Sequence, residues 1–201
     1  MRWTVGLLVI GIVGCGSAEA VSSAREDDPS ALGDSSPPVE DAVSDTFDPP
    51  RPPARLVFDA TKGERSGGAD WVIDTSGQFP SPPHPKLETE WQGGISAWGV
   101  AIHQAGYDVE VLPGGGRITF GDPSNQQDLS RYDVYIVPEP NNPFTATEAT
   151  AMVEFVRAGG GLFVIADHGK SDRDSDGWDS PRAWNDVFDR TGNPFGLSFA
   201  A

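Results

Sequence analysis

The chain has 201 residues, of which 37% are hydrophobic, and its 30 acidic and 14 basic side chains give a formal net charge of −16. This length accommodates one modest folded domain beside any processed or unfolded segment. The acidic excess argues against binding of nucleic acid, because nucleic-acid surfaces neutralise phosphates with Lys and Arg. The single cysteine, Cys15, excludes an intramolecular disulfide and leaves no thiol for catalysis or zinc binding in the folded region.

Residues 1–14 are predicted to be a lipoprotein signal peptide. Arg2 precedes an apolar run over residues 5–13, far shorter than the roughly 20 residues of a membrane-spanning helix. The run ends in Ile12-Val13-Gly14-Cys15, which resembles the bacterial lipobox and implies cleavage before Cys15 and attachment of lipid to it. We therefore expect a membrane partner through lipidated Cys15 and, in a host with two membranes, an outer-membrane location in the cell envelope. The alternative is an ordinary cleaved signal with an incidental cysteine.

Residues 15–53 are predicted to be a disordered tether rich in Pro, Ser and acidic residues. Residues 16–53 hold nine acidic and two basic side chains and almost no aromatic or β-branched clusters. Such a segment buries too little apolar area to offset the entropy lost on ordering. Charge repulsion and proline pairs such as Pro37-Pro38 favour an extended spacer.

The remaining residues, 54–201, alternate strand and helix patterns from their first positions. Residues 56–58 are apolar and predict a strand. A helix is predicted next, and Gly106 ends it before a second strand at residues 109–112. The apolar positions that carry the helical spacing are Ile95, Trp98, Ile102 and Ala105.

A second strand-helix unit follows. Residues 132–137 predict a third strand, and Thr145 with Glu148 forms a capping box in which each side chain satisfies a free backbone amide of the other. The helix that begins there ends in the glycines of 159–161, and the apolar residues 162–166 read as a central parallel strand.

The last predicted helix begins near Ser180, which we expect to cap it, with Pro181 in the first turn. Residues 195–201 resemble the beginning of a further strand, which leaves open whether the domain is complete at residue 201 or truncated there. The alternation predicts an α/β fold with a doubly wound, mostly parallel sheet and flanking helices.

Several local sequences resemble the class I glutamine amidotransferase-like fold, a flavodoxin-like α/β domain, over roughly residues 55–190. They are Phe58-Asp59, the stretch from Gly67 to Asp74, the Pro-Glu-Pro-Asn-Asn loop at 138–142, Ala166-Asp167-His168 and Asp172-Arg173. The resemblance is to a secreted branch of the fold and implies no particular reaction.

The resemblance also implies where a nucleophile would lie. True amidotransferases place a nucleophilic cysteine on the turn after the strand that corresponds to residues 162–166. Here that turn reads Asp167-His168-Gly169, so a cysteine-dependent glutaminase reaction is excluded.

Asp172, Asp174 and Asp176 are predicted metal ligands. Together with Gly177 they match the D-x-D-x-D-G opening of a calcium loop, in which alternate carboxylates converge on the ion. The twelfth position is Ala183 and lacks the bidentate Glu, which argues against an EF-hand. A looser site for calcium or another divalent cation, completed by Asp179 or backbone oxygens, remains open beside a solvated acidic loop.

His168, Asp59 and Glu139 are predicted to be catalytic because each follows a strand. Ligands of open α/β sheets bind at the carboxyl ends of the strands, so these side chains are expected to line one concavity. His168 beside Asp167 would act as a base or a metal ligand, or would merely brace its loop.

Two functions are consistent with these residues. The first is metal-assisted hydrolysis at the strand-end pocket around His168. The second is a noncatalytic module that binds a small-molecule or carbohydrate ligand and is stabilised by calcium in the acidic loop, with Trp178 as a stacking platform.

Overall fold

The computed structural model describes residues 52–200, so the predicted signal peptide, Cys15 and nearly all of the predicted tether lie outside the described residues. The described chain contains a four-stranded sheet with the order β2-β1-β3-β4. All three strand pairs are parallel. The strands are β1 (Arg55–Asp59), β2 (Asp108–Leu112), β3 (Val134–Pro138) and β4 (Gly161–Ile165).

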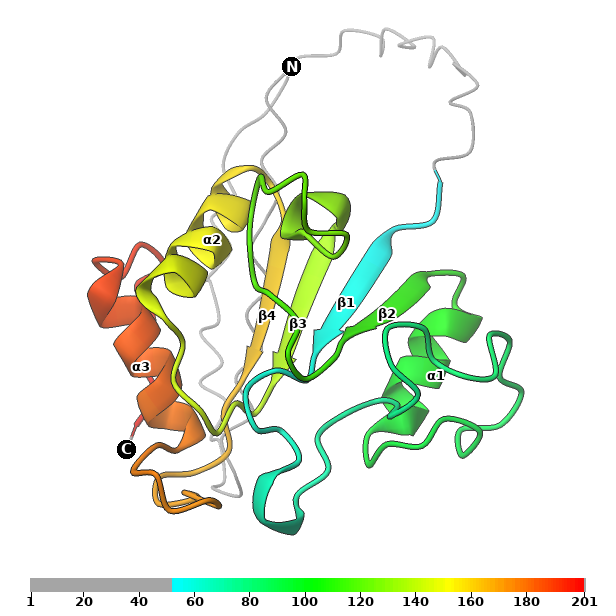
Figure 1. Ribbon diagram of the computed structural model, residues 1–201, viewed down its shortest axis with the longest axis horizontal. Helices are drawn as coiled ribbons and strands as arrows, with labels where there is room; N and C mark the ends of the chain where they lie inside the picture. The colour runs from blue at the N-terminus through cyan, green and yellow to red at the C-terminus, as the bar shows by residue number, and fades with distance from the viewer. Residues whose placement is uncertain (1–51, 201) are drawn as a thin grey trace, which may run out of the picture. The chain divides into compact units, whose positions relative to one another are not determined.

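Three helices cover the two faces of this sheet (Figure 1). α1 (Ser96–Gln104) packs on one face, and α2 (Ala146–Arg157) and α3 (Ser180–Arg190) pack on the other. Short 3-10 turns lie at Ser66–Gly68 and Leu129–Arg131. The predicted α/β fold with a parallel sheet and flanking helices is confirmed. No helix of residues 52–200 combines the length and apolar character needed to cross a membrane.

The alternation of side chains along β1 explains the two-sided core. Val57 belongs to the apolar cluster beneath α2 and α3, and its neighbours Leu56 and Phe58 belong to the cluster beneath α1. Side chains of a strand point to opposite faces in turn, so a strand covered on both faces must be apolar at every position. Trp184 of α3 is fully buried in the larger cluster.

The helix ends follow the sequence signals with one correction. The capping box of α2 forms with both reciprocal bonds, Glu148 N–H to the Thr145 hydroxyl at 3.2 Å and Thr145 N–H to the Glu148 carboxylate at 2.7 Å. The expected Ser180 cap of α3 is wrong. Asp179 caps the helix by accepting the Arg182 N–H at 2.9 Å, and Ser180 lies inside the first turn, where its hydroxyl donates to the Ile165 carbonyl at 3.3 Å.

The segment from 195 to 200 forms no strand, contrary to the sequence-based expectation. Phe195, Leu197 and Phe199 pack against the larger apolar cluster, and Asn185 of α3 exchanges two bonds of 2.9 Å with the backbone of Phe199. The alternating apolar pattern therefore reflects packing of an irregular segment onto a helix.

Candidate functional site

The four strands are parallel, so all of them end at the same edge of the sheet. The loops that follow β1, β3 and β4 hold the predicted site residues. Asp59 is the last residue of β1, Glu139 follows β3 directly, and His168 lies three residues beyond the end of β4. Buried polar groups at this edge depend on contacts between these loops.

Asp59 and Glu64 form a buried pair of carboxyl groups, called here the carboxyl pair. Asp59 is fully buried and Glu64 is 1% exposed. The Thr61 hydroxyl donates to the two Asp59 oxygens at 3.0 and 3.2 Å, and the Lys62 N–H donates to Glu64 Oε2 at 2.7 Å. Glu64 Oε1 and the Tyr135 hydroxyl are buried without a hydrogen-bond partner among the described residues. The pair thus has fewer donors than its oxygens require.

Burial raises the pKa of Asp59, although bonds from Glu64 and Thr61 and the charge of Lys62 oppose the shift. Burial also raises the pKa of Glu64 well above its ordinary value, and the neighbouring Asp59 charge adds to the rise. Two close carboxyl groups in a low dielectric resist double ionisation, which accounts for the raised pKa of both.

Glu139 is also fully buried but has a cationic partner, Arg173. Its backbone is left-handed, with φ of 53°, a conformation uncommon outside glycine. Burial raises the pKa of Glu139, and the bond and charge from Arg173 oppose that rise. Arg173 Nε also donates to the Ser66 carbonyl at 3.1 Å, and its terminal nitrogen donates to the Gly63 carbonyl at 3.3 Å. A single guanidinium therefore joins the loops after β1, β3 and β4.

The acidic loop, residues 172–177, brings three carboxylates together as the sequence predicted. One carboxylate oxygen from each of Asp172, Asp174 and Asp176 lies within 4.8 Å of the others, so the group could hold a metal ion. Asn141 donates to Asp174 at 3.1 Å, and Asn142 donates to Asp174 at 3.0 Å and to Asp176 at 3.3 Å. The loop after β3 thus positions two of the three carboxylates.

Asp172 is held within the acidic loop itself. Its oxygens accept the N–H groups of Asp176 at 3.1 Å and Gly177 at 2.8 Å. These bonds fold the loop back on itself, and Asp174 and Asp176 remain exposed. Each carboxylate oxygen has a second lone pair available for a hard cation.

Two residues predicted to assist this loop have other partners. Asp179 accepts the Lys170 N–H at 2.7 Å and the Arg182 N–H at 2.9 Å, so both of its oxygens are used as helix cap and loop brace. The Arg182 guanidinium lies 4.5 Å from the centre of the Trp178 ring and covers one of its faces. The stacking platform predicted at Trp178 is therefore occupied on that face by a cation of the chain itself.

His168 lies apart from the buried carboxyl groups. Its side chain is 74% exposed and its Nδ1 contacts the carboxylate of Asp167. Its carbonyl accepts the Ser171 hydroxyl at 2.9 Å, and that hydroxyl lies 3.5 Å from Glu139 Oε1. Among the described residues, no hydrogen bond joins the side chains of His168, Asp59 and Glu139. The Ser171 hydroxyl therefore lies between the His168 carbonyl and the Glu139 carboxyl group. Asp59 belongs to the carboxyl pair instead.

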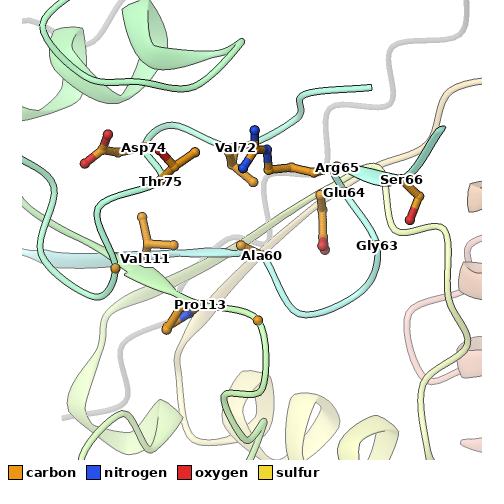
Figure 2. Close-up of a pocket in the computed structure, with 12 residues that line it drawn as sticks. Ala60, Gly63, Glu64, Arg65, Ser66, Val72, Asp74, Thr75, Val111 and Pro113 are labelled. Carbon is orange, nitrogen blue, oxygen red and sulfur yellow. The ribbon is translucent and has the colours of Figure 1, made fainter. Parts of the chain in front are cut away.

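A cavity of about 340 Å³ opens beside the carboxyl pair. Figure 2 shows the Glu64 side chain extending from its loop toward Ala60 at the end of β1, while the Arg65 side chain extends toward Val72. The lining residues are Ala60, Gly63, Glu64, Arg65, Ser66, Val72, Asp74, Thr75, Gly77, Val111, Pro113 and Gly114. Asp59, Glu139 and His168 are not among them.

Sequence reasoning missed Glu64. The one signal that could have found it is its place in the loop after the first strand, five residues beyond Asp59, but no periodicity distinguishes it from neighbouring charged residues. Gly114, in the segment after β2, also contributes to the wall of the cavity. The cavity is thus built by the loops after β1 and β2, on the side of the edge away from β4.

Compared with protein-family models, with curated proteins and with solved structures, the chain shows no significant match. The amidotransferase-like resemblance of the short sequence stretches remains a hypothesis, because the α/β fold alone does not define a family or an activity. Functional conclusions must come from the groups at the carboxyl edge.

Proposed function

We propose that the domain is a ligand-binding module of the cell envelope whose acidic loop binds a divalent cation, with calcium preferred over magnesium. The observation that supports this is the grouping of Asp172, Asp174 and Asp176 oxygens within 4.8 Å on a loop with calcium-loop spacing. Calcium accepts six to eight oxygen ligands in irregular geometry, while magnesium requires a near-ideal octahedron. The acidic loop is partly exposed, so water can complete the coordination of a calcium ion.

The bound cation would affect all the loops at the edge of the sheet where the strands end. It would offset the repulsion among three crowded carboxylates. Asn141 and Asn142 join the loop to the segment after β3, and Arg173 joins it to the segment after β1, so a loop fixed by calcium would hold both segments. This supports a noncatalytic role in which the cation stiffens the rim of a ligand site.

Thermal unfolding of the full-length protein with chelator, with calcium and with magnesium tests the cation site. A ligand that binds only the folded state at one hundred times its Kd stabilises it by about 2.7 kcal/mol. We expect calcium to raise the melting midpoint, magnesium to raise it much less, and Asp174→Asn to remove the response. Asp189→Asn, an equal charge change at an exposed position of α3, should keep it. Coincident melting curves with calcium and with chelator would rule the site out.

Metal-assisted hydrolysis is the second candidate, and the contact between His168 Nδ1 and Asp167 favours it. A carboxylate that orients an imidazole is the arrangement of a general base. If His168 is the base, His168→Ala should abolish calcium-dependent turnover of nitrophenyl esters or glycosides while leaving the melting midpoint unchanged. His84→Ala, at another exposed histidine, is the control. A lower midpoint with turnover unchanged would assign His168 to bracing its loop.

We also propose that lipidated Cys15 anchors the protein to a membrane, in the outer membrane of a host that has one. This rests on the lipobox-like Ile12-Val13-Gly14-Cys15 and on Gly16, since Asp at that position would favour retention in the inner membrane under the usual sorting rule. Cys15→Ser should move the protein from the detergent phase to the aqueous phase. Unchanged partition would remove the lipid anchor.

A further inference from the structure

We propose that the cavity beside the carboxyl pair binds a small organic cation whose ammonium group faces Asp59 and Glu64. This inference names the class of ligand for the proposed ligand-binding function. It rests on that function only in assuming that the domain binds a ligand. It concerns the loops after β1 and β2 and does not require a cation in the acidic loop.

The basic side chains near the cavity are paired with acidic groups other than the carboxyl pair. Three basic side chains lie in the loop after β1 or contact it, and each has another acidic partner. Lys62 pairs with Glu148 at 2.7 Å, Arg65 contacts Asp70 at 3.3 Å, and Arg173 pairs with Glu139. Among residues 52–200, no basic side chain forms an ion pair with the carboxyl pair, although the charge of Lys62 acts on Asp59.

Asp74, on the cavity wall, adds negative charge. Its oxygens accept the N–H groups of Gln92 at 2.7 Å and Ser81 at 2.9 Å. Burial opposes its ionisation, but these bonds lower the pKa of Asp74. Both Asp74 oxygens are thus already bonded to backbone N–H groups, and its negative charge adds to that of the cavity wall.

The buried Glu64 carboxyl provides an unused acceptor. Its Oε1 has no hydrogen-bond partner among the described residues, and Glu64 lines the cavity. Figure 2 shows its carboxyl end at the level of Ala60. An ammonium group in the cavity would supply the positive charge that this buried carboxyl lacks. In a low dielectric the attraction acts over several ångströms, so the cation need not contact both carboxyl groups.

The volume of the cavity and the apolar part of its lining favour an organic cation over a bare metal ion. A volume of about 340 Å³ falls in the range of small-molecule sites. Val72, Val111 and Pro113 give the wall an apolar part that a metal ion would not use. A short hydrocarbon body carrying one ammonium group matches both parts of the lining.

Binding of such a cation is coupled to the proton of the carboxyl pair. The ammonium stabilises the doubly ionised pair, so binding should release a proton, and affinity should rise with pH until the amine itself loses its charge. The charged and titratable groups that face the pair or the cavity are Lys62, Arg65, Asp74, Tyr135 and Glu148. Tyr135 does not titrate in this range, because burial raises its pKa well above its ordinary value.

The test uses n-butylamine as the probe and 1-butanol as its uncharged counterpart, added to the full-length protein with chelator present. Amide shifts of Gly63, Glu64 and Gly77 in NMR spectra report binding at the cavity. We expect n-butylamine to bind at least tenfold more tightly than 1-butanol, with proton release detected by calorimetry in buffers of different ionisation enthalpy. Equal binding of the two probes, or shifts confined to other regions, would overturn the proposal.

Two variants separate charge from shape. Glu64→Gln keeps the shape and provides its own donor, so it should fold and should weaken n-butylamine binding at least tenfold. Gly114→Val leaves the charges intact and places a side chain in the cavity. The substitution should fit, because a Cβ at this position meets only the Ala60 carbonyl, at 3.7 Å. Asp189→Asn, at an exposed position of α3, should bind n-butylamine as the wild type does.

Calcium distinguishes this inference from the proposed cation site. Calcium that stabilises the protein without competing with n-butylamine supports two separate sites. Competition that survives Asp174→Asn would mean that the carboxyl pair takes a metal ion and would overturn the organic-cation proposal. A missing calcium response beside normal n-butylamine binding would refute the acidic-loop proposal alone.

Discussion

Asp128 and the carboxyl pair are equally buried, but their surroundings have opposite effects on ionisation. Asp128 is 1% exposed and caps the turn at Leu129–Arg131. Burial alone would raise its pKa, but hydrogen bonds from Ser130, Thr119 and nearby N–H groups lower the pKa of Asp128 to about 2. Burial raises the pKa of Asp59 and Glu64, which have few donors. Hydrogen-bond donors thus lower the pKa of Asp128, while Asp59 and Glu64, with few donors, keep a raised pKa.

Glu139 is a third case, in which a buried carboxylate is held by a cation. Its partner Arg173 belongs to the acidic loop, so the ion pair is also the connection between that loop and the rest of the edge. These four buried acids are thus surrounded by hydrogen-bond donors (Asp128), by a cation (Glu139) or by each other (Asp59 and Glu64). In the last arrangement the negative charge can be compensated by a cationic ligand.

The largest effect is expected from Arg173→Ala, which removes the cation from Glu139. Removing one partner of a buried ion pair typically costs about 3–5 kcal/mol, because the other charge stays buried and unpaired. We expect a loss in this range in urea unfolding. Arg190→Ala, which breaks an exposed pair with Asp186, should cost less than about 1 kcal/mol. Similar losses for the two variants would show that Glu139 does not depend on Arg173.

Asp128 should make a clear contribution to stability that acid removes. Its folded pKa lies below its unfolded pKa, so the stability it contributes is present above the unfolded value and lost as pH falls toward about 2. At 1.36 kcal/mol per pKa unit, the loss is about 2 kcal/mol. The free-energy difference between wild type and Asp128→Asn should therefore shrink by about that amount between neutral and acid pH. A constant difference across this range would contradict the donor argument.

The smallest effect, of opposite sign, is expected from Glu64→Gln. The folded pKa of Glu64 is raised, so its presence costs stability progressively as pH rises above the unfolded value. The variant should gain on the wild type over that pH range and match it in acid. Denaturant unfolding of both proteins at several pH values measures this. A variant that loses stability at neutral pH would mean that Glu64 is ionised and satisfied in the fold.

Much of the fold could be predicted from local patterns. The apolar runs of β1 and β4, the stop at Gly106 and the capping box of α2 are each encoded within a few residues. The grouping of the three acidic-loop carboxylates could also be predicted, since alternate positions of one short loop converge whatever surrounds them. The sequence by itself therefore determined the α/β class and a candidate cation site.

Only the tertiary structure decided which acids are buried and what they contact. The strand order places the loops after β1, β3 and β4 together, so Arg173 reaches Glu139 and Ser66, and Glu64 folds back onto Asp59. His168 follows an apolar strand as predicted, but its ring is exposed. Periodicity reports which face a side chain occupies within its own element. The desolvation and donor count that set a site's charge come from residues distant in sequence, which meet only when the sheet forms.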